Sequence, residues 1–547
     1  MTQLNQSGWK PEMKALSPSG EGGYVETFTG NRALMLEEPL IFEIGGRETC
    51  GVDFVDLPLP LRGEGRGEGA GKPSQADTPL SQPSPLKERG LERATPIGLP
   101  GLSEPETIRH YTRLSRQNYA IDLGLFPLGS CTMKHNPRLN EKVARMAGFA
   151  DVHPLAPHET VQGALAVIHE LAHWLVTLTG MKAVAMSPKA GAHGELCGVL
   201  AIKAALQARG ENRPVILVPE SAHGTNPATA AFAGFRVESI PATAEGRVDV
   251  EALKAKLGPD VAGVMITNPN TCGLFERDLK TISDAVHAAG GYVYCDGANF
   301  NAIVGRVRPG DLGVDAMHIN LHKTFSTPHG GGGPGSGPVV LSEALAPFAP
   351  LPFVVKRGEE FVLIEEETAG EHHGQSFGRM TAFHGQMGMF TRALAYILSH
   401  GADGLRQVAE DAVLNANYIL RSLDDVLDAP FGGSGPCMHE ALFTDDNLAE
   451  GFSTLDIAKG LIDEGYHPMT VYFPLVVHGA MLVEPTETES KATLDQFIGA
   501  LRSVANRARQ GDLALKSAPH FAPRRRLDET LAARKPVLVW KEEGAGD

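Results

Sequence analysis

The stretch that decides the fold and the site is His318-Ile-Asn-Leu-His-Lys-Thr-Phe325, which continues through His329 into the glycines 330–333. The apolar segment Val314 to Ile319 predicts a strand that ends at this loop. A lysine here, followed by glycines that let backbone approach a ring and a phosphate, favours an imine between Lys323 and pyridoxal phosphate. A histidine–lysine pair alone is weak support, because most lysines are solvated surface charges.

A second strand signal upstream strengthens this interpretation. The segment Gly290-Gly-Tyr-Val-Tyr-Cys-Asp-Gly-Ala-Asn299 is apolar up to Asp296 and continues with small residues. A carboxylate at a strand end can keep the pyridinium nitrogen of the cofactor protonated, which makes the ring an electron sink. Asp296 and Lys323 together therefore predict a pyridoxal-phosphate site.

Length and composition limit the class of protein. The 547 residues suffice for two or three packed units, and 42% hydrophobic with 21% charged residues is ordinary for a globular chain. The net charge of -16 argues against a nucleic-acid partner, since no basic excess exists to displace counterions. No apolar run approaches the roughly 18 residues of a membrane span, and Met1 to Lys14 lacks the apolar core of a secretion signal. We therefore expect a cytoplasmic protein with neither a nucleic-acid nor a membrane partner.

The cysteines carry no pairing pattern. No CxxC motif occurs among the six cysteines, which are Cys50, Cys131, Cys197, Cys272, Cys295 and Cys437. This spacing predicts reduced thiols, most of them buried, in a cytosolic enzyme without a metal site.

Composition divides the chain into four predicted parts. Residues 1–56 form an N-terminal arm. Residues 57–100 are rich in Gly, Pro and Ser and have too little apolar surface to offset ordering entropy, which predicts a disordered insertion. Residues 101–351 predict a large cofactor-binding domain with its N-terminal segment, and residues 352–547 predict a smaller α/β domain that closes over it.

Strand and helix signals alternate along the large domain. The predicted strands are 183–186, 214–218, 261–267, 292–295 and 314–319, and the predicted helices are 158–180, 195–208 and 279–289. This alternation predicts a parallel sheet covered by helices on both faces. Ligands gather at the carboxyl ends of the strands in such sheets, where Asp296 and Lys323 fall. In the smaller domain, helices are predicted at 379–399, 405–423, 455–464 and 492–507, with strands near 439–443 and 481–484.

Loops after the other strands supply further candidates. Ser187-Pro-Lys-Ala-Gly-Ala-His-Gly194 opens a helix, whose N-terminal N–H groups and dipole suit a phosphate, although most such loops are only turns. His223 could stack on the pyridine ring, or it belongs to a helix-capping segment. Thr271 could bond to the ring hydroxyl or the phosphate, or it lies in an Asn-Pro turn. Pro127 to Lys134, well before the sheet, indicates a structural connection when taken alone.

Four motifs follow one another in a specific order. They are Pro127-Leu-Gly-Ser-Cys-Thr-Met-Lys134, Ala190-Gly-Ala-His-Gly-Glu195, His223-Gly-Thr-Asn-Pro227, and His322-Lys-Thr-Phe325 with Pro328-His-Gly-Gly-Gly-Gly-Pro-Gly335. In this order they resemble the glycine decarboxylase P-protein family of the glycine cleavage system, in particular subunit 2, the cofactor-bearing half of its two-subunit bacterial form. The resemblance runs from about Glu104 to the C-terminus, with a weaker match at Glu38 to Glu43. The insertion at 57–100 departs from the family pattern but precedes every motif.

The resemblance implies an α/β fold of the type I pyridoxal-phosphate class, with a mostly parallel sheet in the large domain. It implies Lys323 as the covalent cofactor lysine, Asp296 as the pyridinium partner and His223 as the stacking residue. The further cofactor-binding residues that it implies are Ala298, Thr271, Ala190, Gly191 and His322. It leaves open the roles of His329, Ser130, Thr132 and Arg379.

The resemblance also implies an activity, glycine dehydrogenase (decarboxylating), in which glycine loses carbon dioxide and its aminomethyl group passes to the lipoyl arm of the H-protein. The implied partners are the lipoylated H-protein and a cofactor-less subunit 1, in a heterotetramer of two plus two. The alternative is a free-standing pyridoxal-phosphate-dependent amino-acid decarboxylase or lyase. A cofactor-free scaffold subunit is disfavoured by the joint presence of Lys323 and Asp296.

Overall fold

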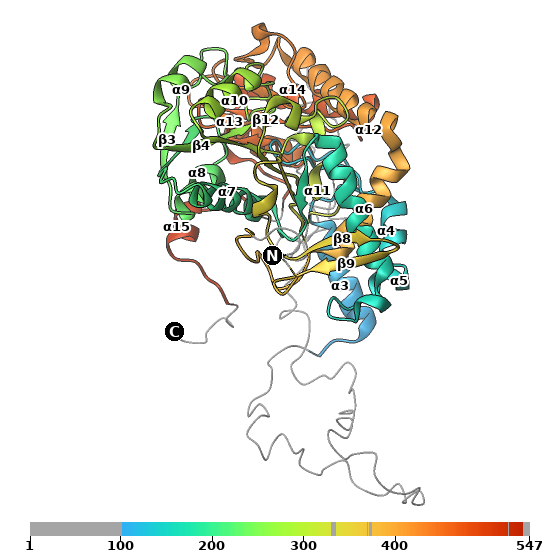
Figure 1. Cartoon of the computed structure of the whole chain (residues 1–547). Coiled ribbons are helices and arrows are strands. Elements are labelled where there is room, and N and C mark those ends of the chain that lie inside the picture. The colour runs from blue at the N-terminus through green and yellow to red at the C-terminus, as the bar shows by residue number, and fades with distance from the viewer. Residues whose placement is uncertain (1–100, 330–334, 369, 371–374, 523, 540–547) are drawn as a thin grey trace, which may run out of the picture. The chain divides into compact units, whose positions relative to one another are not determined.

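The structure is a computed structural model that describes residues 101–329, 335–368, 370, 375–522 and 524–539 (Figure 1). The predicted arm at 1–56 and the predicted insertion at 57–100 lie outside the described residues. The chain divides into two compact units, with described residues 101–118 in one and 119–539 in the other. The first contains α3 (Glu104–Arg116), whose start is set by a capping box between Ser103 and Glu106.

A seven-stranded sheet with the order β1-β7-β6-β5-β4-β2-β3 organises the second unit. Its strands are β1 (Ala183–Ala185), β2 (Val215–Pro219), β3 (Arg236–Ile240), β4 (Val261–Thr267), β5 (Tyr292–Asp296), β6 (Ala316–His318) and β7 (Val339–Leu341). The pairs β2–β3, β2–β4, β4–β5 and β5–β6 are parallel, which confirms the predicted mostly parallel sheet. The prediction that all strands are parallel is wrong for β7, which is antiparallel to both β1 and β6. The chain turns back after β6 without a crossover helix, and only such a helix would bring β7 in parallel.

Helices cover both faces of this sheet. The helices of the second unit are α4 (Arg138–Ala144), α5 (Ala147–Ala150), α6 (Gln162–Thr179), α7 (Gly191–Ala208), α8 (Thr225–Phe232), α9 (Val250–Lys256), α10 (Leu279–Ala288), α11 (Leu321–Thr324), α12 (Met387–Leu423), α13 (Thr454–Asp463), α14 (Lys491–Arg509) and α15 (Glu529–Arg534). Along β5, Tyr292 and Tyr294 face the core shared with α7 and α8, while Val293 and Cys295 face the core shared with α6 and α10. Gly180, the last residue of the helix predicted at 158–180, caps α6 with a φ of 73°.

A second, smaller sheet has its own core. It has the order β10-β12-β11, with β10 (Ala441–Phe443), β11 (Thr470–Val471) and β12 (Met481–Val483). It packs with α13, α14 and the C-terminal part of α12. The division of the chain at residues 351 and 352 stays a prediction. The hairpin of β8 (Phe353–Arg357) and β9 (Glu360–Ile364) lies just beyond it.

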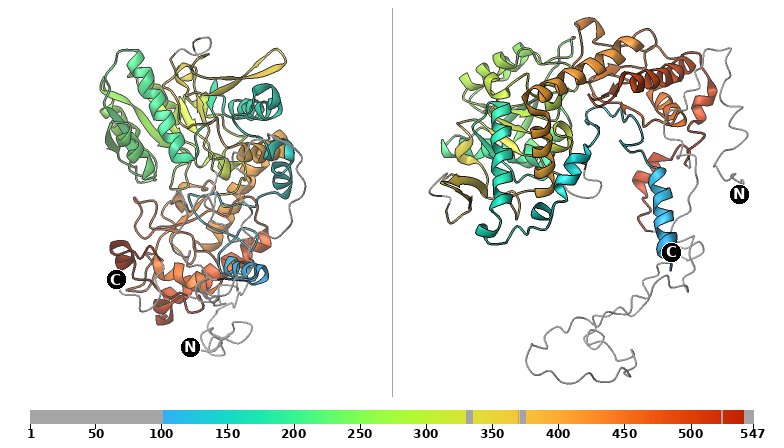
Figure 2. Two further views of the ribbon diagram at one scale, coloured as in Figure 1. Left: turned by 90° about the horizontal axis from the view of Figure 1, so that it is seen from below. Right: turned by 90° about the vertical axis from the view of Figure 1, so that its right-hand side faces the viewer.

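Helix α12 connects the two cores. Its residues up to Ala409 pack in the core of the large sheet, and its residues from Ala416 pack in the core of the small sheet. It bends at Gly401, which has a φ of 63° and a ψ of -174°, and the right-hand view of Figure 2 shows this bend. The two predicted helices of this region are therefore confirmed as separate helical segments on either side of the non-helical Gly401, and the first of them begins at Met387 rather than at 379.

Among the residues that the structure describes, no helix is both long enough and apolar enough to cross a membrane. The five described cysteines are unpaired and all but Cys131 are buried, whereas Cys50 lies outside the described residues.

Candidate active site

Lys323 lies at the carboxyl edge of the large sheet. It belongs to α11, the four-residue helix that follows β6, and only 9% of the residue is exposed. Its Nζ donates a hydrogen bond to the backbone carbonyl of Ser130 at 2.8 Å. Ser130 belongs to Pro127–Lys134, so the interpretation of this segment as a mere connection was incomplete. The structure brings a distant stretch of chain directly against the candidate cofactor lysine.

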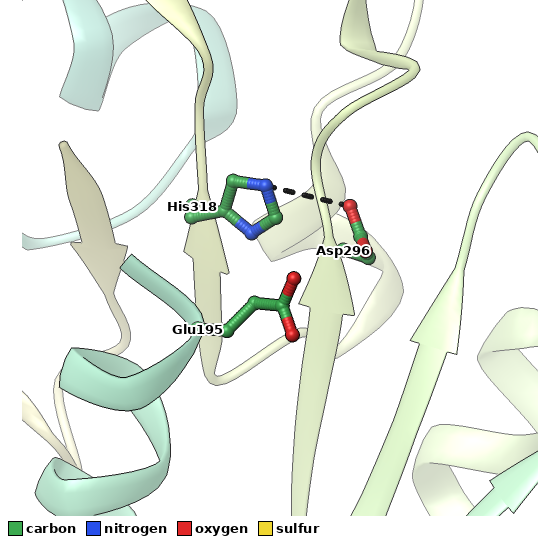
Figure 3. Close-up of side chains that lie close together, drawn as sticks. All are labelled: Glu195, Asp296 and His318. Atoms are coloured by element: carbon green, nitrogen blue, oxygen red, sulfur yellow. Dashed lines mark ion pairs between the residues drawn. The ribbon is translucent and has the colours of Figure 1, made fainter. Parts of the chain in front are cut away.

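Asp296 ends β5, and His318 ends the neighbouring strand β6 (Figure 3). His318 Nε2 lies 3.4 Å from Asp296 Oδ1, and Asn226 Nδ2 donates to Asp296 Oδ2 at 2.9 Å. The backbone N–H of Ala298 donates to Asp296 Oδ1, also at 2.9 Å. Each carboxylate oxygen is thus held by at least one neighbouring group.

These surroundings keep Asp296 ionised. Burial acts to raise the pKa of Asp296, but His318 and the donors from Asn226 and Ala298 outweigh burial, so the pKa lies below its ordinary value. Burial raises the pKa of the Tyr294 hydroxyl, which lies within hydrogen-bond distance of His318 Nδ1 at 2.6 Å. His318 Nε2 lies 3.0 Å from Asn320 Oδ1 in addition to its contact with the carboxylate. A buried, ionised carboxylate of this kind suits a cationic ring nitrogen.

A second carboxyl group, Glu195 in the first turns of α7, lies beside Asp296 (Figure 3). Burial, and then the charge of Asp296, raise the pKa of Glu195. Asn226 Nδ2 donates to Glu195 Oε2 at 2.9 Å and thereby bridges the two carboxyl groups. Sequence reasoning assigned no role to Glu195, although it ends one of the four motifs.

The N-terminus of α7 can hold an anion. No side chain caps this helix at Ala190, and the first N–H groups of an α-helix have no partner within it. The loop leaves no room for larger residues, since a Cβ on Gly191 would lie 2.6 Å from Asn320 Nδ2. A Cβ on Gly337 would lie 2.2 Å from the carbonyl oxygen of Ala190. This crowding places the helix start against the loop that carries Lys323.

Several buried polar atoms have no hydrogen-bond partner among the described residues. Around α11 and the loop before α7 they are Ser187 Oγ, His322 Nδ1, Thr324 Oγ1, Thr327 Oγ1, His329 Nε2 and Ser336 Oγ. Burial lowers the pKa of His322 to about 3 and that of His329 to about 4, so both rings are neutral at neutral pH. Orphaned polar atoms are costly in a folded protein. This donor set fits a phosphorylated, polar cofactor.

The remaining predicted residues lie at the same sheet edge. His223 follows β2, is exposed, and contacts Thr225 Oγ1 at 2.9 Å and the ring of Phe473 at 5.7 Å. Thr271 follows β4, is buried, and donates its hydroxyl to the carbonyl of Ser221. Ala298 is half-buried directly after Asp296. Arg379, in contrast, forms ion pairs with Glu365 and Glu366.

Sequence reasoning missed the contribution of the small sheet. Glu440 immediately precedes β10, Glu484 immediately follows β12, and both are fully buried together with His439. Charged side chains next to wholly apolar strands were a signal for them, because such residues are seldom fully buried without a reason. Their distance from Lys323 along the chain concealed the connection.

Comparison with known proteins places this geometry in a class. Residues 198–413 match the family described as Aminotransferase class-V. A crystal structure of glycine decarboxylase (P-protein) of the glycine cleavage system matches with a TM-score of 0.63 and 23% identity, over 75% of this chain and 92% of that one. The sphingosine-1-phosphate lyase of Burkholderia pseudomallei matches with a TM-score of 0.57 and 15% identity, over 78% and 96%. At such identities the likeness concerns the fold, and it confirms the predicted type I α/β fold.

Closer relatives show the family. Residues 408–520 match the family described as Glycine dehydrogenase, C-terminal domain. A Caulobacter vibrioides protein named probable glycine dehydrogenase (decarboxylating) subunit 2 is 62% identical over 546 residues, which is 99% of each chain. A protein of the same name from Thermotoga maritima is 50% identical over 459 residues, 83% of this chain and 94% of the relative. The chain belongs to the family of glycine dehydrogenase (decarboxylating) subunit 2, as the four motifs predicted.

Proposed function

We propose that this chain decarboxylates glycine with pyridoxal 5'-phosphate bound at Lys323 and passes the aminomethyl group to the lipoyl arm of an H-protein. Membership of the glycine dehydrogenase family supports the reaction. The observation that carries the site is the position of a buried lysine amine and a buried, ionised carboxylate after adjacent strands of one sheet edge. This is the pair of groups that the cofactor requires.

Each part of the cofactor has a candidate partner. The carboxylate of Asp296 would hold the proton on the ring nitrogen, while Asn226 and the Ala298 N–H orient that carboxylate. The N-terminus of α7 with Ala190 and Gly191 would bind the phosphate. His223 would stack on the ring, and Thr271 would bond to the ring hydroxyl or to the phosphate. Ala298 would lie below the ring and His322 near the phosphate.

The reaction divides between cofactor and protein. When bound, pyridoxal phosphate supplies a ring that accepts the electron pair left behind as carbon dioxide departs. Lys323 supplies the amine for covalent attachment, and the Ser130 carbonyl holds a proton of that amine. His322 and His329 are neutral, so they can donate or accept hydrogen bonds without adding charge near the substrate carboxylate.

The proposed assembly includes two protein partners. The name of the relatives, subunit 2, supports a two-subunit enzyme. We assign the second place to a cofactor-less subunit 1, in a heterotetramer of two plus two, and the aminomethyl acceptor to a lipoylated H-protein.

Borohydride trapping tests the site. Reduction of the purified yellow protein should bleach its visible band and leave a pyridoxyl adduct on the peptide that contains Lys323. Lys323→Ala should lose the adduct and all glycine decarboxylation, because no other amine replaces the attachment point. Lys203→Ala is the matched control, since Lys203 also donates to a backbone carbonyl at 2.8 Å, that of Ala233, but lies in the C-terminal half of α7 rather than at its N-terminus. An adduct on Lys134 or Lys189 would contradict the assignment.

A further inference from the structure

The backbone of Ser130 connects Lys323 to a buried carboxyl group of the small sheet. The N–H of Ser130 donates to Glu440 Oε1, while its carbonyl accepts from Lys323 Nζ at 2.8 Å. Glu440 is fully buried. A single residue therefore lies between a group of the small sheet and the amine at the edge of the large sheet.

Ser130 has an unusual backbone conformation that needs support. Its φ is 62°, in the left-handed region that residues with a side chain rarely adopt. Non-glycine residues persist there only when their surroundings hold them, and such positions cluster at functional sites. The hydrogen bond from the Ser130 N–H to Glu440 is one such restraint.

The segment before Ser130 is anchored to the small sheet as well. Leu128 pairs with Val483 of β12 in an antiparallel bridge, and Thr470 Oγ1 donates to the carbonyl of Gly129 at 2.6 Å. A Cβ on Gly129 would lie 2.5 Å from the carbonyl oxygen of Leu482, so this contact admits only glycine without a shift. These contacts fix the chain directly before Ser130 to β11 and β12 of the small sheet.

The groups that face Glu440 are few and buried. His439 and Glu484 lie with it in one cluster, with polar atoms within 4.8 Å of one another, and all three residues are fully buried. Burial raises the pKa of Glu484 well above its ordinary value and also raises that of Glu440, while Lys323 acts to lower both. Burial lowers the pKa of His439 to about 3, so this ring is neutral. No cation in this cluster therefore competes with the Ser130 N–H for the carboxyl group of Glu440.

We infer that Glu440 is a positioning residue for Lys323 that acts through the backbone of Ser130. It holds Ser130 in the left-handed conformation that directs the carbonyl at the lysine amine. Docking of the small sheet and orientation of the lysine are thereby coupled. This inference deepens the proposed function, because it rests on Lys323 as the cofactor lysine.

Chemical labelling of Lys323 in the full chain, after removal of cofactor by dialysis against hydroxylamine, tests the inference. Acetic anhydride in trace amount at about pH 8 labels free amines, and mass spectrometry gives the rate for the Lys323 peptide relative to the other lysines. Glu440→Met keeps the volume but offers no acceptor, so it should raise the rate at Lys323 about tenfold, the loss expected for one charge-assisted hydrogen bond. Glu440→Gln keeps an acceptor oxygen and should stay within about threefold of the unchanged chain on the same reasoning.

A rescue separates positioning from a general structural role. Glycine adopts a positive φ at no steric cost, so Ser130→Gly in the Glu440→Met background should restore most of the slow labelling. Glu276→Gln is the control, since Glu276 is equally buried but bonds to Asn270 and the Val248 N–H. It should leave Lys323 labelling unchanged.

Three results would overturn the inference: unchanged labelling in Glu440→Met, an equal increase in Glu440→Gln, or no rescue by Ser130→Gly. Melting temperatures confirm that each variant is folded. The labelling involves no cofactor, so it remains informative even if borohydride trapping fails to find pyridoxal phosphate on Lys323.

Discussion

At the residue scale, Asp296 carries the clearest chemical expectation. Asp296→Asn keeps the shape and an acceptor for the Ala298 N–H but removes the charge that would hold a proton on the ring nitrogen. The cofactor should still attach to Lys323. Decarboxylation should be at least about a hundredfold slower, a loss of about 2.7 kcal/mol of transition-state stabilisation.

Release of labelled carbon dioxide from glycine measures this rate, and borohydride trapping measures attachment. Asp315→Asn is the control, because Asp315 is also a buried aspartate at a strand end but precedes β6 at the opposite edge of the sheet. It should lower stability without a comparable loss of rate. An Asp296→Asn variant with full activity would make Asp296 a structural residue.

At the scale of elements, a buried lysine joins its own loop to four other parts of the chain. Lys134 Nζ donates to Asn301 Oδ1, the Thr324 carbonyl, Tyr396 OH and Glu487 Oε1 at 2.7 to 3.1 Å. Its side chain is 1% exposed and that of Glu487 is 8% exposed. The loop that contains Ser130 is thus tied to the segment after β5, to α11, to α12 and to the segment after β12.

Removal of this lysine should be costly. Lys134→Met leaves Glu487 buried without its cation, so the free energy of unfolding should fall by about 3–5 kcal/mol. Lys134→Met with Glu487→Gln should recover a substantial part, since the unpaired charge is then gone. Denaturant unfolding measures both. Lys491→Met, which breaks an exposed pair with Asp495, should change stability little. An equally small effect at Lys134 would show that the network is energetically neutral.

The stability contributed by the hydrogen bond between His287 in α10 and Asp315, directly before β6, should depend on pH. The hydrogen bond from His287 Nε2 to Asp315 Oδ2 at 2.7 Å raises the pKa of His287 above its ordinary value. A raised folded-state pKa stabilises the fold below the unfolded value of about 6.5, and this contribution disappears as the pH rises through the folded-state pKa. The His287 side chain is 38% exposed, so we expect less than about 1 kcal/mol.

Melting temperatures of the unchanged chain and of His287→Gln test this expectation. The variant should be less stable than the unchanged chain at about pH 5.5, and the two should converge at about pH 9, above the titration range. A difference that is constant across this range would show that the contact does not involve protonation.

Elements with strong local signals were predictable, and those without were not. β4 was predicted with its observed bounds because Val261–Thr267 is a continuous apolar run. β7 and the β8–β9 hairpin had no counterpart in the prediction, since three-residue strands and partly exposed hairpins carry little periodicity. Lys323 was predicted on a loop but lies in α11, because one turn of helix is too short to show a pattern.

At the scale of the whole molecule, the chain should require a partner. The loop after β11 exposes large apolar side chains, with Leu475 80%, Tyr472 47% and Val476 37% exposed. Contiguous exposed apolar side chains commonly mark interaction surfaces. We expect weak activity of the chain alone and full activity with the cofactor-less subunit. Size-exclusion chromatography with light scattering, with each chain alone and with both mixed, measures the association.

Glycine–bicarbonate exchange under the same conditions measures the activity. A stable lone species with full exchange activity would contradict the two-subunit assembly and favour the self-sufficient decarboxylase. Leu475→Ser should weaken association if this loop lies in the interface, whereas Leu414→Ser, at an exposed leucine on α12, is the matched control.

The sequence by itself determined the local chemistry: a lysine after one strand, an aspartate at the end of another, and an uncapped helix start between small residues. Apolar spacing and residue type act over a few residues, and parallel strands bring their carboxyl ends to one edge by topology alone. Only the tertiary structure decided that Ser130 reaches Lys323, 193 residues away, and Glu440, 310 residues away. Such contacts depend on how two separately packed cores dock through α12 and the 127–134 loop. That docking is the sum of many weak surface contacts, and no local pattern encodes it.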